Sequence, residues 1–407
     1  MFALILILAL GDVAVFGFSL AMTNTNPDKV NKDIIGSLSS NNSDTIFQDT
    51  KEELFKQANS FLTKQPTSVM DKTQLPASGN RHDFLELGPY CWPDSKSPNG
   101  LPYICEDARG VNPEFYAIPD YKNMLDLIKR TKTLALAYHI SLNDTYASKA
   151  TDLLQVWFLS NNTKMNPNMQ YSEVIPGLNN GSRHGIISAH GFTEIIDALR
   201  LIEKSPSWTR QDQQGMKNWF NDYLVWLMNS NSGIQEGESR NNHGTYYVVQ
   251  VSAISLFLNK TDITKRILQE SMDELIPVQI LADGRQPLEL MRKKSLDYSS
   301  FNLLGLFKLA KIGDHVGIDL WNFKASNGAG LQKALDHLLP YLLNNESSPY
   351  VQKAPTGWGL SNAATLLREA TIHYPDNELY IQAYKSMDQK YLIADIDNLV
   401  SPPSTNR

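Results

Sequence analysis

The feature that most constrains the fold is the helical spacing of apolar residues, which continues almost without interruption from Asp120 onward. In the first such segment Met124, Leu127, Ile128 and Leu134 fall on one face of a helix. The distance from each predicted helix to the next but one is roughly 40–50 residues, a period typical of stacked helical hairpins. The sequence therefore predicts an all-α fold, an incomplete (α/α) toroid whose long loops line one end. An open α-solenoid is the alternative.

The predicted helices follow one another over most of the chain. They are expected over residues 51–63, 124–136, 146–158, 188–204, 210–229, 243–258, 262–281, 296–312, 329–344, 359–373 and 378–390. We find no alternating strand pattern, no G-x-G-x-x-G motif and no P-loop in the sequence. Residues 76–117 differ in character, because Pro, Gly and aromatic residues crowd them, and this indicates a long ordered loop with a functional role.

The composition excludes two broad classes of protein. Of the 407 residues, 42% are hydrophobic and 20% are charged, which allows a large core and excludes a disordered or fibrous chain. The formal net charge is −6 and no basic run occurs, which argues against nucleic acid as a partner. Aromatic residues make up 10% of the chain, a proportion that suits a carbohydrate-binding cleft as well as a large core.

The first residues are similar to a secretory signal. Residues 2–21 form an apolar run that ends in the small-x-small sequence Ser19-Leu20-Ala21. An uncleaved membrane anchor is the alternative, but Asp12 within the run would be costly in lipid. We expect a secreted, extracellular monomer that has no membrane contact after cleavage. The expected divisions are a signal peptide over 1–21, a polar linker over 22–49, one toroid domain over 50–395 and a tail over 396–407.

Two further patterns agree with secretion. Six N-x-S/T sequons occur, of which we expect some to carry glycans, and they lie at Asn41, Asn143, Asn161, Asn180, Asn259 and Asn345. Cys91 and Cys105 are 14 positions apart, and in an oxidising compartment they are expected to form a disulfide worth about 3 kcal/mol. Two free buried thiols are the alternative. Two cysteines without a neighbouring His pair do not make a zinc site.

A polar stretch before one predicted helix carries the first candidate chemistry. Asn241, Asn242 and His243 stand there side by side, with Arg240 before them and Tyr246 after them. Helix capping accounts for one asparagine. An amide beside an imidazole can also bind a carboxylate through charge-assisted hydrogen bonds, so we predict substrate contacts here.

Two other stretches contain arginine. Arg292 and Tyr298 stand six positions apart around a helix start, and a nearby arginine lowers the pKa of a phenol. A core tyrosine with a satisfied hydroxyl is the alternative for Tyr298. Arg183 and His184 end a loop rich in Asn, Gly and Pro, where they are candidates for anion binding, although a plain loop explains the same composition.

Taken in order, these motifs resemble those of the alginate lyase domain family, which comprises helical-toroid polysaccharide lyases. The similarity covers roughly residues 80–310. It rests on LGPYCWPD at 87–94, GLPY at 100–103, VNPE at 111–114, TLALAY at 133–138, MNPN at 165–168, IPG at 175–177, NNHGT at 241–245 and PLEL at 287–290. Each block is weak alone, whereas their common order is specific.

The resemblance implies β-elimination at a uronic acid of an acidic polysaccharide, with alginate or polymannuronate as the first expectation and glucuronan as the next. No metal or organic cofactor is implied. Asn242 and His243 would neutralise the substrate carboxylate, with Arg292 adding positive charge. Tyr298 would take the C5 proton and return a proton to the leaving O4, and His243, His184 and His190 are alternative bases. The expected substrate contacts are Asn241, Tyr90, Trp92, Arg183, His184, Tyr246 and Arg240.

The chain departs from the family pattern at several positions. Cys91 stands where tryptophan is common, and Asp297 precedes Tyr298 where histidine is common. Glu173 replaces the amide that commonly lies shortly before the Ile-Pro-Gly block. The spacing from Arg292 to Tyr298 is one residue shorter than in the best-known alginate lyases. These departures bear on the substrate more than on the reaction.

Two functions of other classes remain open at this point. A glycoside hydrolase on an α/α barrel would use paired carboxylates such as Glu236 and Glu289. A non-catalytic carbohydrate-binding solenoid would need only stacking aromatics such as Tyr90, Trp92 and Tyr103. The latter leaves the Asn-His and Arg-Tyr sets without a role.

Overall fold

Apolar positions at helical spacing fold the chain into helical hairpins, as the sequence predicts. The computed structural model of the protein describes residues 41–343 and 347–404, and residues 45–405 belong to one unit. The helices are α2 (Asn41–Leu62), α3 (Asp120–Ser141), α4 (Asp144–Leu154), α5 (Phe192–Ile202), α6 (Arg210–Asn229), α7 (Asn231–Gly237), α8 (Asn242–Phe257), α9 (Thr261–Glu270), α10 (Ile276–Gln279), α11 (Pro287–Leu290), α12 (Ser295–Asp314), α13 (Leu331–Leu342), α14 (Gly357–His373), α15 (Glu378–Ser386) and α16 (Gln389–Ala394).

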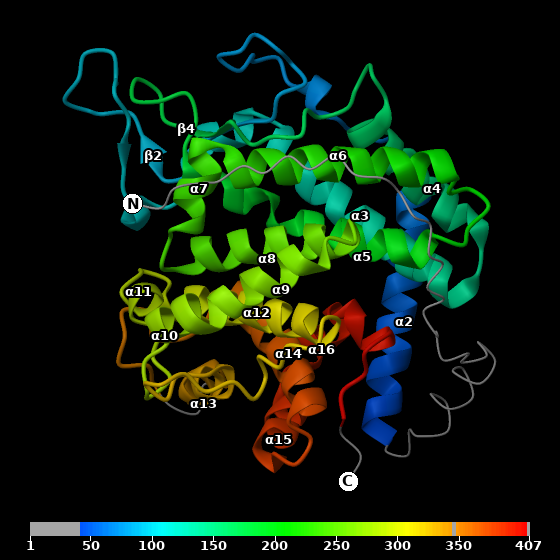
Figure 1. Ribbon diagram of the computed structural model, residues 1–407, viewed down its shortest axis with the longest axis vertical. Coiled ribbons are helices and arrows are strands. Elements are labelled where there is room, and N and C mark those ends of the chain that lie inside the picture. Colours follow the sequence, from blue (N-terminus) through cyan, green and yellow to red (C-terminus); the bar gives the residue numbers. More distant parts are fainter. Residues whose placement is uncertain (1–40, 344–346, 405–407) are drawn as a thin grey trace. The chain divides into compact units, whose positions relative to one another are not determined.

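The helices form an inner and an outer layer. Within the described residues, α3, α5, α8, α12 and α14 contact one another in that order. Of the others, α4 packs on α3, α6 and α9 pack on α8, α13 packs on α12, and α15 packs on α14, and Figure 1 shows α6, α8 and α9 one below another. The inner helix α8 is apolar on nearly all sides because neighbours cover it all round, whereas the outer α9 is amphipathic. This is the predicted incomplete (α/α) toroid.

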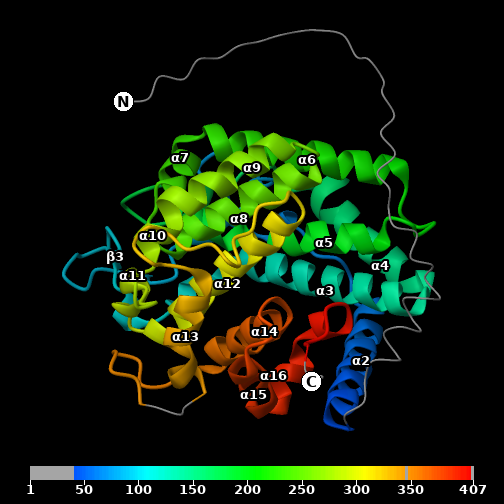
Figure 2. The same cartoon turned by 60° about the horizontal axis from the view of Figure 1, so that its bottom comes forward.

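Two apolar clusters make up the core, and α8 contributes to both. One consists of residues between Leu54 and Phe257 together with Leu399, and the other consists of residues between Tyr246 and Leu392. Helix α2 places Phe47 against the first cluster and Ile46 against the second. In Figures 1 and 2 the red C-terminal segment lies beside α2, so the two ends of the described chain meet where the clusters meet.

Charged side chains gather in a pocket that the inner helices enclose. We call this group the lumen cluster, and it consists of Lys132, Glu194, Lys308, Arg368, Glu369 and Asp397. Nζ of Lys132 bonds Glu194 at 2.7 Å and Asp397 at 2.9 Å, and Nζ of Lys308 bonds Glu194 at 2.5 Å. The cluster thereby joins α3, α5 and α12 to the segment that follows α16.

The inner helices begin at one end of the toroid. The first turn of α12 contacts the first turn of α14, where the rings of Tyr298 and Trp358 meet edge to face at 5.4 Å. The first turn of α8 contacts the 3₁₀ segment Arg183–Gly191 that leads into α5, where the rings of His243 and His184 lie 5.1 Å apart. Because a helix dipole is positive at its N-terminus, this end of the toroid favours anions.

Short strands, which the sequence did not predict, hold the loops at this end. β1 (Leu85–Leu87) pairs in parallel with β4 (Tyr171–Val174). β2 (Cys91–Trp92) pairs antiparallel with β3 (Ile104–Cys105), which sets Cys91 opposite Cys105. The two cysteines form the predicted disulfide. With only two to four residues each, these strands were too short to show an alternating pattern.

The structure corrects the predicted boundaries at both ends of the toroid. Helix α2 begins at Asn41, so part of the predicted linker over 22–49 is helical. The predicted tail from residue 396 packs inward, because Asn398 and Leu399 are buried and Asp397 bonds Lys132. The predicted signal peptide lies outside the described residues, and among the described helices none is long and apolar enough to cross a membrane.

Four of the predicted sequons have exposed asparagines, and glycosylation stays a prediction. These are Asn143, Asn161, Asn180 and Asn259. The side chain of Asn41 and the whole of Asn345 lie outside the described residues.

Candidate active site

One half of the candidate site is built around the first turn of α12, and we call it the tyrosine group (Tyr90, Arg292, Tyr298 and Trp358). The hydroxyl of Tyr298 lies 3.0 Å from the hydroxyl of Tyr90, which comes from the loop between β1 and β2. The guanidinium of Arg292 stacks on the Tyr298 ring at 3.8 Å from its centroid. Nε of Arg292 bonds Asp107 at 2.9 Å. The predicted association of Arg292 with Tyr298 is therefore present.

Trp358 belongs to this group but was not predicted from the sequence. It stands in the first turn of α14, meets the edge of Tyr298 and leaves 39% of its surface exposed. Its ring therefore presents an exposed apolar face beside the Tyr298 phenol. The only sequence signal is a tryptophan between two glycines at a helix start, which is too common a pattern to indicate a site.

The pKa of Tyr298 moves in the direction opposite to the sequence-based expectation. Burial raises this pKa, the neighbouring hydroxyl of Tyr90 raises it further, and the positive charge of Arg292 offsets only part of the effect. Tyr298 is consequently a neutral phenol in the resting protein. The prediction counted the arginine and missed the burial.

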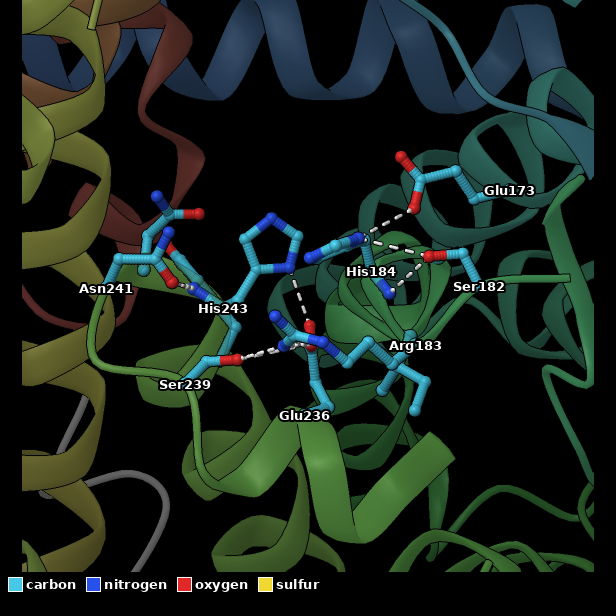
Figure 3. A network of polar contacts seen from close by, with 12 residues as sticks. Glu173, Ser182, Arg183, His184, Glu236, Ser239, Asn241 and His243 are labelled. Atoms are coloured by element: carbon cyan, nitrogen blue, oxygen red, sulfur yellow. Dashed lines mark hydrogen bonds and ion pairs between the residues drawn. The ribbon is translucent and has the colours of Figure 1, made fainter. Parts of the chain in front are cut away.

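The other half of the site is the histidine group (Glu173, Arg183, His184, Glu236 and His243), shown in Figure 3. Nδ1 of His243 lies 2.6 Å from Oε1 of Glu236, whose carboxylate is completely buried. Because a carboxylate can only accept a hydrogen bond, Nδ1 carries the proton. The second ring nitrogen, Nε2, points away from Glu236 in Figure 3.

Arg183 binds the carboxylate of Glu236. Its Nη1 donates to Oε2 of Glu236 at 3.1 Å and to the hydroxyl of Ser239. The sequence predicted substrate contact for Arg183, whereas the structure uses its guanidinium to hold the carboxylate that holds His243. The role of Glu236 was missed because it stands seven residues before His243, outside the Asn-Asn-His motif.

The two neighbouring asparagines have different roles. The side-chain oxygen of Asn241 caps α8 by accepting the His243 N–H at 3.3 Å, which is the alternative that the sequence left open for this motif. Asn242 is 1% exposed, and both its backbone N–H and its Nδ2 donate to Glu289 at 2.7 Å. Glu289 lies in α11, three residues before Arg292, so Asn242 connects the histidine group to the tyrosine group.

His184 and Glu173 complete the histidine group. The His184 ring lies against His243, and its Nδ1 is 3.6 Å from Oε2 of Glu173 and 3.1 Å from the Ser182 hydroxyl. Partial burial, with His243 in its protonated form and the Arg183 guanidinium as further causes, lowers the pKa of His184 to about 4. His184 is therefore a neutral ring near pH 7.

Three predicted site residues lie elsewhere. Tyr246 is 1% exposed, its ring stacks on Phe301 at 4.2 Å, and its hydroxyl donates to the Phe301 carbonyl, so the predicted substrate contact is wrong. Arg240 is exposed beside a groove lined by α8 and α9, where no described contact joins it to the histidine group. His190, an alternative base, packs against both Tyr246 and Phe301, and burial lowers its pKa to about 3.

The disulfide-closed loop carries the remaining predicted contacts. Tyr90 precedes Cys91, and Trp92 follows it. The indole N–H of Trp92 donates to the Gly110 carbonyl at 3.2 Å, and the Arg109 guanidinium covers its ring at 5.0 Å. Trp92 thus lies on the rim, while Tyr90 reaches Tyr298. Among the described residues no cluster of His, Cys, Asp and Glu could hold a metal ion.

Comparisons with known proteins agree with this architecture. The sequence matches the profile of the alginate lyase family over residues 68–348, which leaves Trp358 beyond the match. A crystal structure of an alginate lyase from Bacteroides ovatus is 35% identical, with a TM-score of 0.80 over 86% of this chain and 93% of that chain. No curated protein matched the chain.

More distant structures share the fold alone. Alginate lyase A1-III from Sphingomonas species A1 is 17% identical, with a TM-score of 0.50 over 79% of this chain and 86% of that chain. A variant of alginate lyase A1-III complexed with a tetrasaccharide is 15% identical, with a TM-score of 0.52 over 83% and 93%. From the profile match and the 35% identical structure together, this chain belongs to the alginate lyase family and is a polysaccharide lyase.

Proposed function

We propose that this lyase cleaves a 1,4-linked polyuronate by β-elimination and leaves 4,5-unsaturated uronate ends. Alginate is the first substrate because the 35% identical relative is an alginate lyase, and glucuronan is the second. The observation that carries the proposal is that one end of the toroid carries both a neutral phenol, Tyr298, in the first turn of α12, and an imidazole, His243, in the first turn of α8, whose Nδ1 is fixed on a buried carboxylate.

The negative charge of the substrate carboxylate must first be neutralised. Removal of the C5 proton places negative charge on the C6 carboxylate, so donors that bind this group lower the barrier. The Asn242 amide has two N–H groups. One donates to Glu289, and we assign the other to the substrate carboxylate. The converging helix N-termini add positive potential in the same region.

Proton transfer then divides between two side chains. With Nδ1 protonated, Nε2 of His243 has a free electron pair and accepts the C5 proton. The C4–O4 bond breaks as the C4=C5 bond forms, and Tyr298 donates its phenolic proton to O4. The guanidinium stacked on the ring stabilises the phenolate that results. This assignment differs from the sequence-based expectation, in which Tyr298 was the base, because the phenol begins protonated.

The hydrolase alternative loses its support. Glu236 accepts bonds from His243 and Arg183, and Glu289 accepts two from Asn242. Both oxygens of each carboxylate are used in these bonds, so neither carboxylate is free to transfer a proton to a glycosidic oxygen. A glycosidase needs its acid and base on either side of an accessible glycosidic bond.

The proposal is tested with purified protein on polymannuronate, polyguluronate, glucuronan and a neutral glucan. We expect ultraviolet absorbance from an unsaturated product on at least one polyuronate and none on the glucan. New reducing ends without this absorbance would indicate a hydrolase. Binding without any cleavage would indicate a carbohydrate-binding protein.

A further inference from the structure

Glu173 occupies an unusual position beside His184. It stands in β4 with a backbone φ of +53°, in the left-handed region that residues other than glycine rarely adopt. Such conformations cost about 1–3 kcal/mol and gather at functional sites. The stem of Glu173 packs against Gly88, where an added Cβ would lie 3.5 Å from its Cγ.

The carboxyl group of Glu173 points into the histidine group without a cation of its own. Its side chain is 20% exposed, and its Oε2 is buried without a hydrogen-bond partner, 3.6 Å from Nδ1 of His184. Nη1 of Arg183 donates to Glu236 and Ser239, and no described hydrogen bond or ion pair joins this guanidinium to Glu173. His184 is neutral near pH 7, as described above.

The surroundings of Glu173 determine when it ionises. Burial raises its pKa, and the nearby Glu236 raises it as well, whereas a hydrogen bond from Ser182 and the charges of His243 and Arg183 lower it. Glu86, buried on the far side in β1, has a pKa of about 8 because of burial, with Glu173 as a further contributor. An incoming carboxylate would add one more negative charge to this set.

We propose that Glu173 binds the uronate carboxylate of the substrate in its protonated form, donating its O–H where the family commonly has an amide N–H. This inference rests on the proposed polyuronate substrate. When Glu173 is ionised in the free protein, binding takes up one proton from solvent, since two facing carboxylates cannot both remain charged without a cation between them. Affinity is therefore lost as the pH rises through the pKa of Glu173.

The test compares KM for unsaturated-product formation across pH in the wild type, in Glu173→Gln and in Glu238→Gln. Glu238 is exposed and lies outside the histidine group, so its variant is the matched control. We expect KM of the wild type and the control to rise about tenfold for each pH unit above the pKa of Glu173. KM of Glu173→Gln should stay flat over the same range. Equal pH dependence in all three proteins overturns the proposal.

Calorimetry measures the proton uptake on binding directly, without relying on KM. Binding of polyuronate oligosaccharide to Tyr298→Phe, in two buffers of different ionisation enthalpy, should show proton uptake that Tyr298→Phe/Glu173→Gln lacks. No difference between these proteins contradicts the role of Glu173. Should Glu173→Gln fail to fold, Glu173→Asp must still show the rise of KM with pH. Failure of the wild type on every polyuronate rejects the proposed function instead, while calorimetry with an acidic oligosaccharide still reports on Glu173.

Discussion

The lumen cluster and the histidine group use the same kinds of charged side chain in opposite ways. In the lumen cluster every carboxylate has a cationic partner, because Glu194 binds two lysines and Glu369 binds both Lys311 and Arg368. In the histidine group Arg183 and His243 share one carboxylate, Glu236, and the basic group that the described contacts place within 4 Å of Glu173 is the neutral ring of His184.

The pKa shifts express this difference. Burial works against ionisation of Glu194, but the ammonium groups of Lys132 and Lys308 outweigh it and hold its pKa well below the usual range. Burial raises the pKa of Glu173, where no such pair of cations is present. Complete pairing joins helices, whereas incomplete pairing leaves a site that can respond to an added anion or proton. Substitutions in the two regions should therefore separate stability from turnover.

The largest effect is expected for Tyr298→Phe. Loss of the phenolic proton forces O4 to leave as an alkoxide, so kcat should fall about 10³-fold, while oligosaccharide binding and thermal stability stay near wild type. The matched control is Tyr246→Phe, which removes a buried hydroxyl that bonds the Phe301 carbonyl. That variant should lose about 1 kcal/mol of stability and keep its activity. More than a tenth of wild-type kcat in Tyr298→Phe would assign the acid to another group.

The next effect is expected for His243→Ala. Without the base, kcat should fall about 10²–10³-fold with a smaller change in KM, as measured by product absorbance at saturating substrate. His139→Ala, at the exposed end of α3, is the control and should leave kcat unchanged. An unchanged kcat in His243→Ala would show that this histidine only supports the start of α8.

A third substitution acts on the lumen cluster. Glu194→Gln leaves Lys132 with Asp397 as its carboxylate partner and takes from Lys308 the carboxylate that it bonds at 2.5 Å. Removal of this shared partner from a largely buried set of charges should lower the free energy of unfolding by about 3 kcal/mol. Denaturant unfolding measures this, and kcat at a temperature where the variant is folded should match the wild type. Asp197→Asn, an exposed change one turn later in α5, should cost less than about 0.5 kcal/mol. A large fall in kcat for Glu194→Gln would mean that the two regions are coupled.

The smallest effect is expected from removal of the disulfide. Cys91→Ser/Cys105→Ser should lower stability by no more than about 3 kcal/mol, since the bond closes a short loop of 14 positions at the edge of the toroid. KM should rise severalfold because Tyr90 and Trp92 flank Cys91, while kcat changes little. Loss of turnover comparable to that of Tyr298→Phe would place the loop in the chemistry itself.

Sequence reasoning succeeded where the signal is local and periodic. The toroid followed from apolar spacing, and the association of Arg292 with Tyr298 followed from their positions around one helix start. The predicted substrate contact of Tyr246 was wrong because the sequence does not show which of the adjacent residues Tyr246 and Tyr247 faces the core. Successive positions of a helix face different neighbours. The inward-facing Tyr246 became core, while Tyr247 is only half-buried.

The rest of the site depends on distant pairings that no local pattern reveals. Glu236 binds Arg183 from 53 positions away, and Tyr90 meets Tyr298 across 208 positions. The pKa of Tyr298 depends on how deeply α12 and the Tyr90 loop bury it, a quantity that spacing cannot supply. Trp358 joined the site only because α14 packs on α12.

The contact between Asp397 and Lys132 has a consequence for synthesis on the ribosome. Lys132 emerges early, in the first inner helix, and waits for a partner that is translated 265 positions later. Trp358, beside the catalytic phenol, also arrives late. Nascent chains that lack the last hairpins therefore hold an unfinished ring and an unfinished site, so enzymatic activity can begin only after the segment that contains Asp397 has been translated.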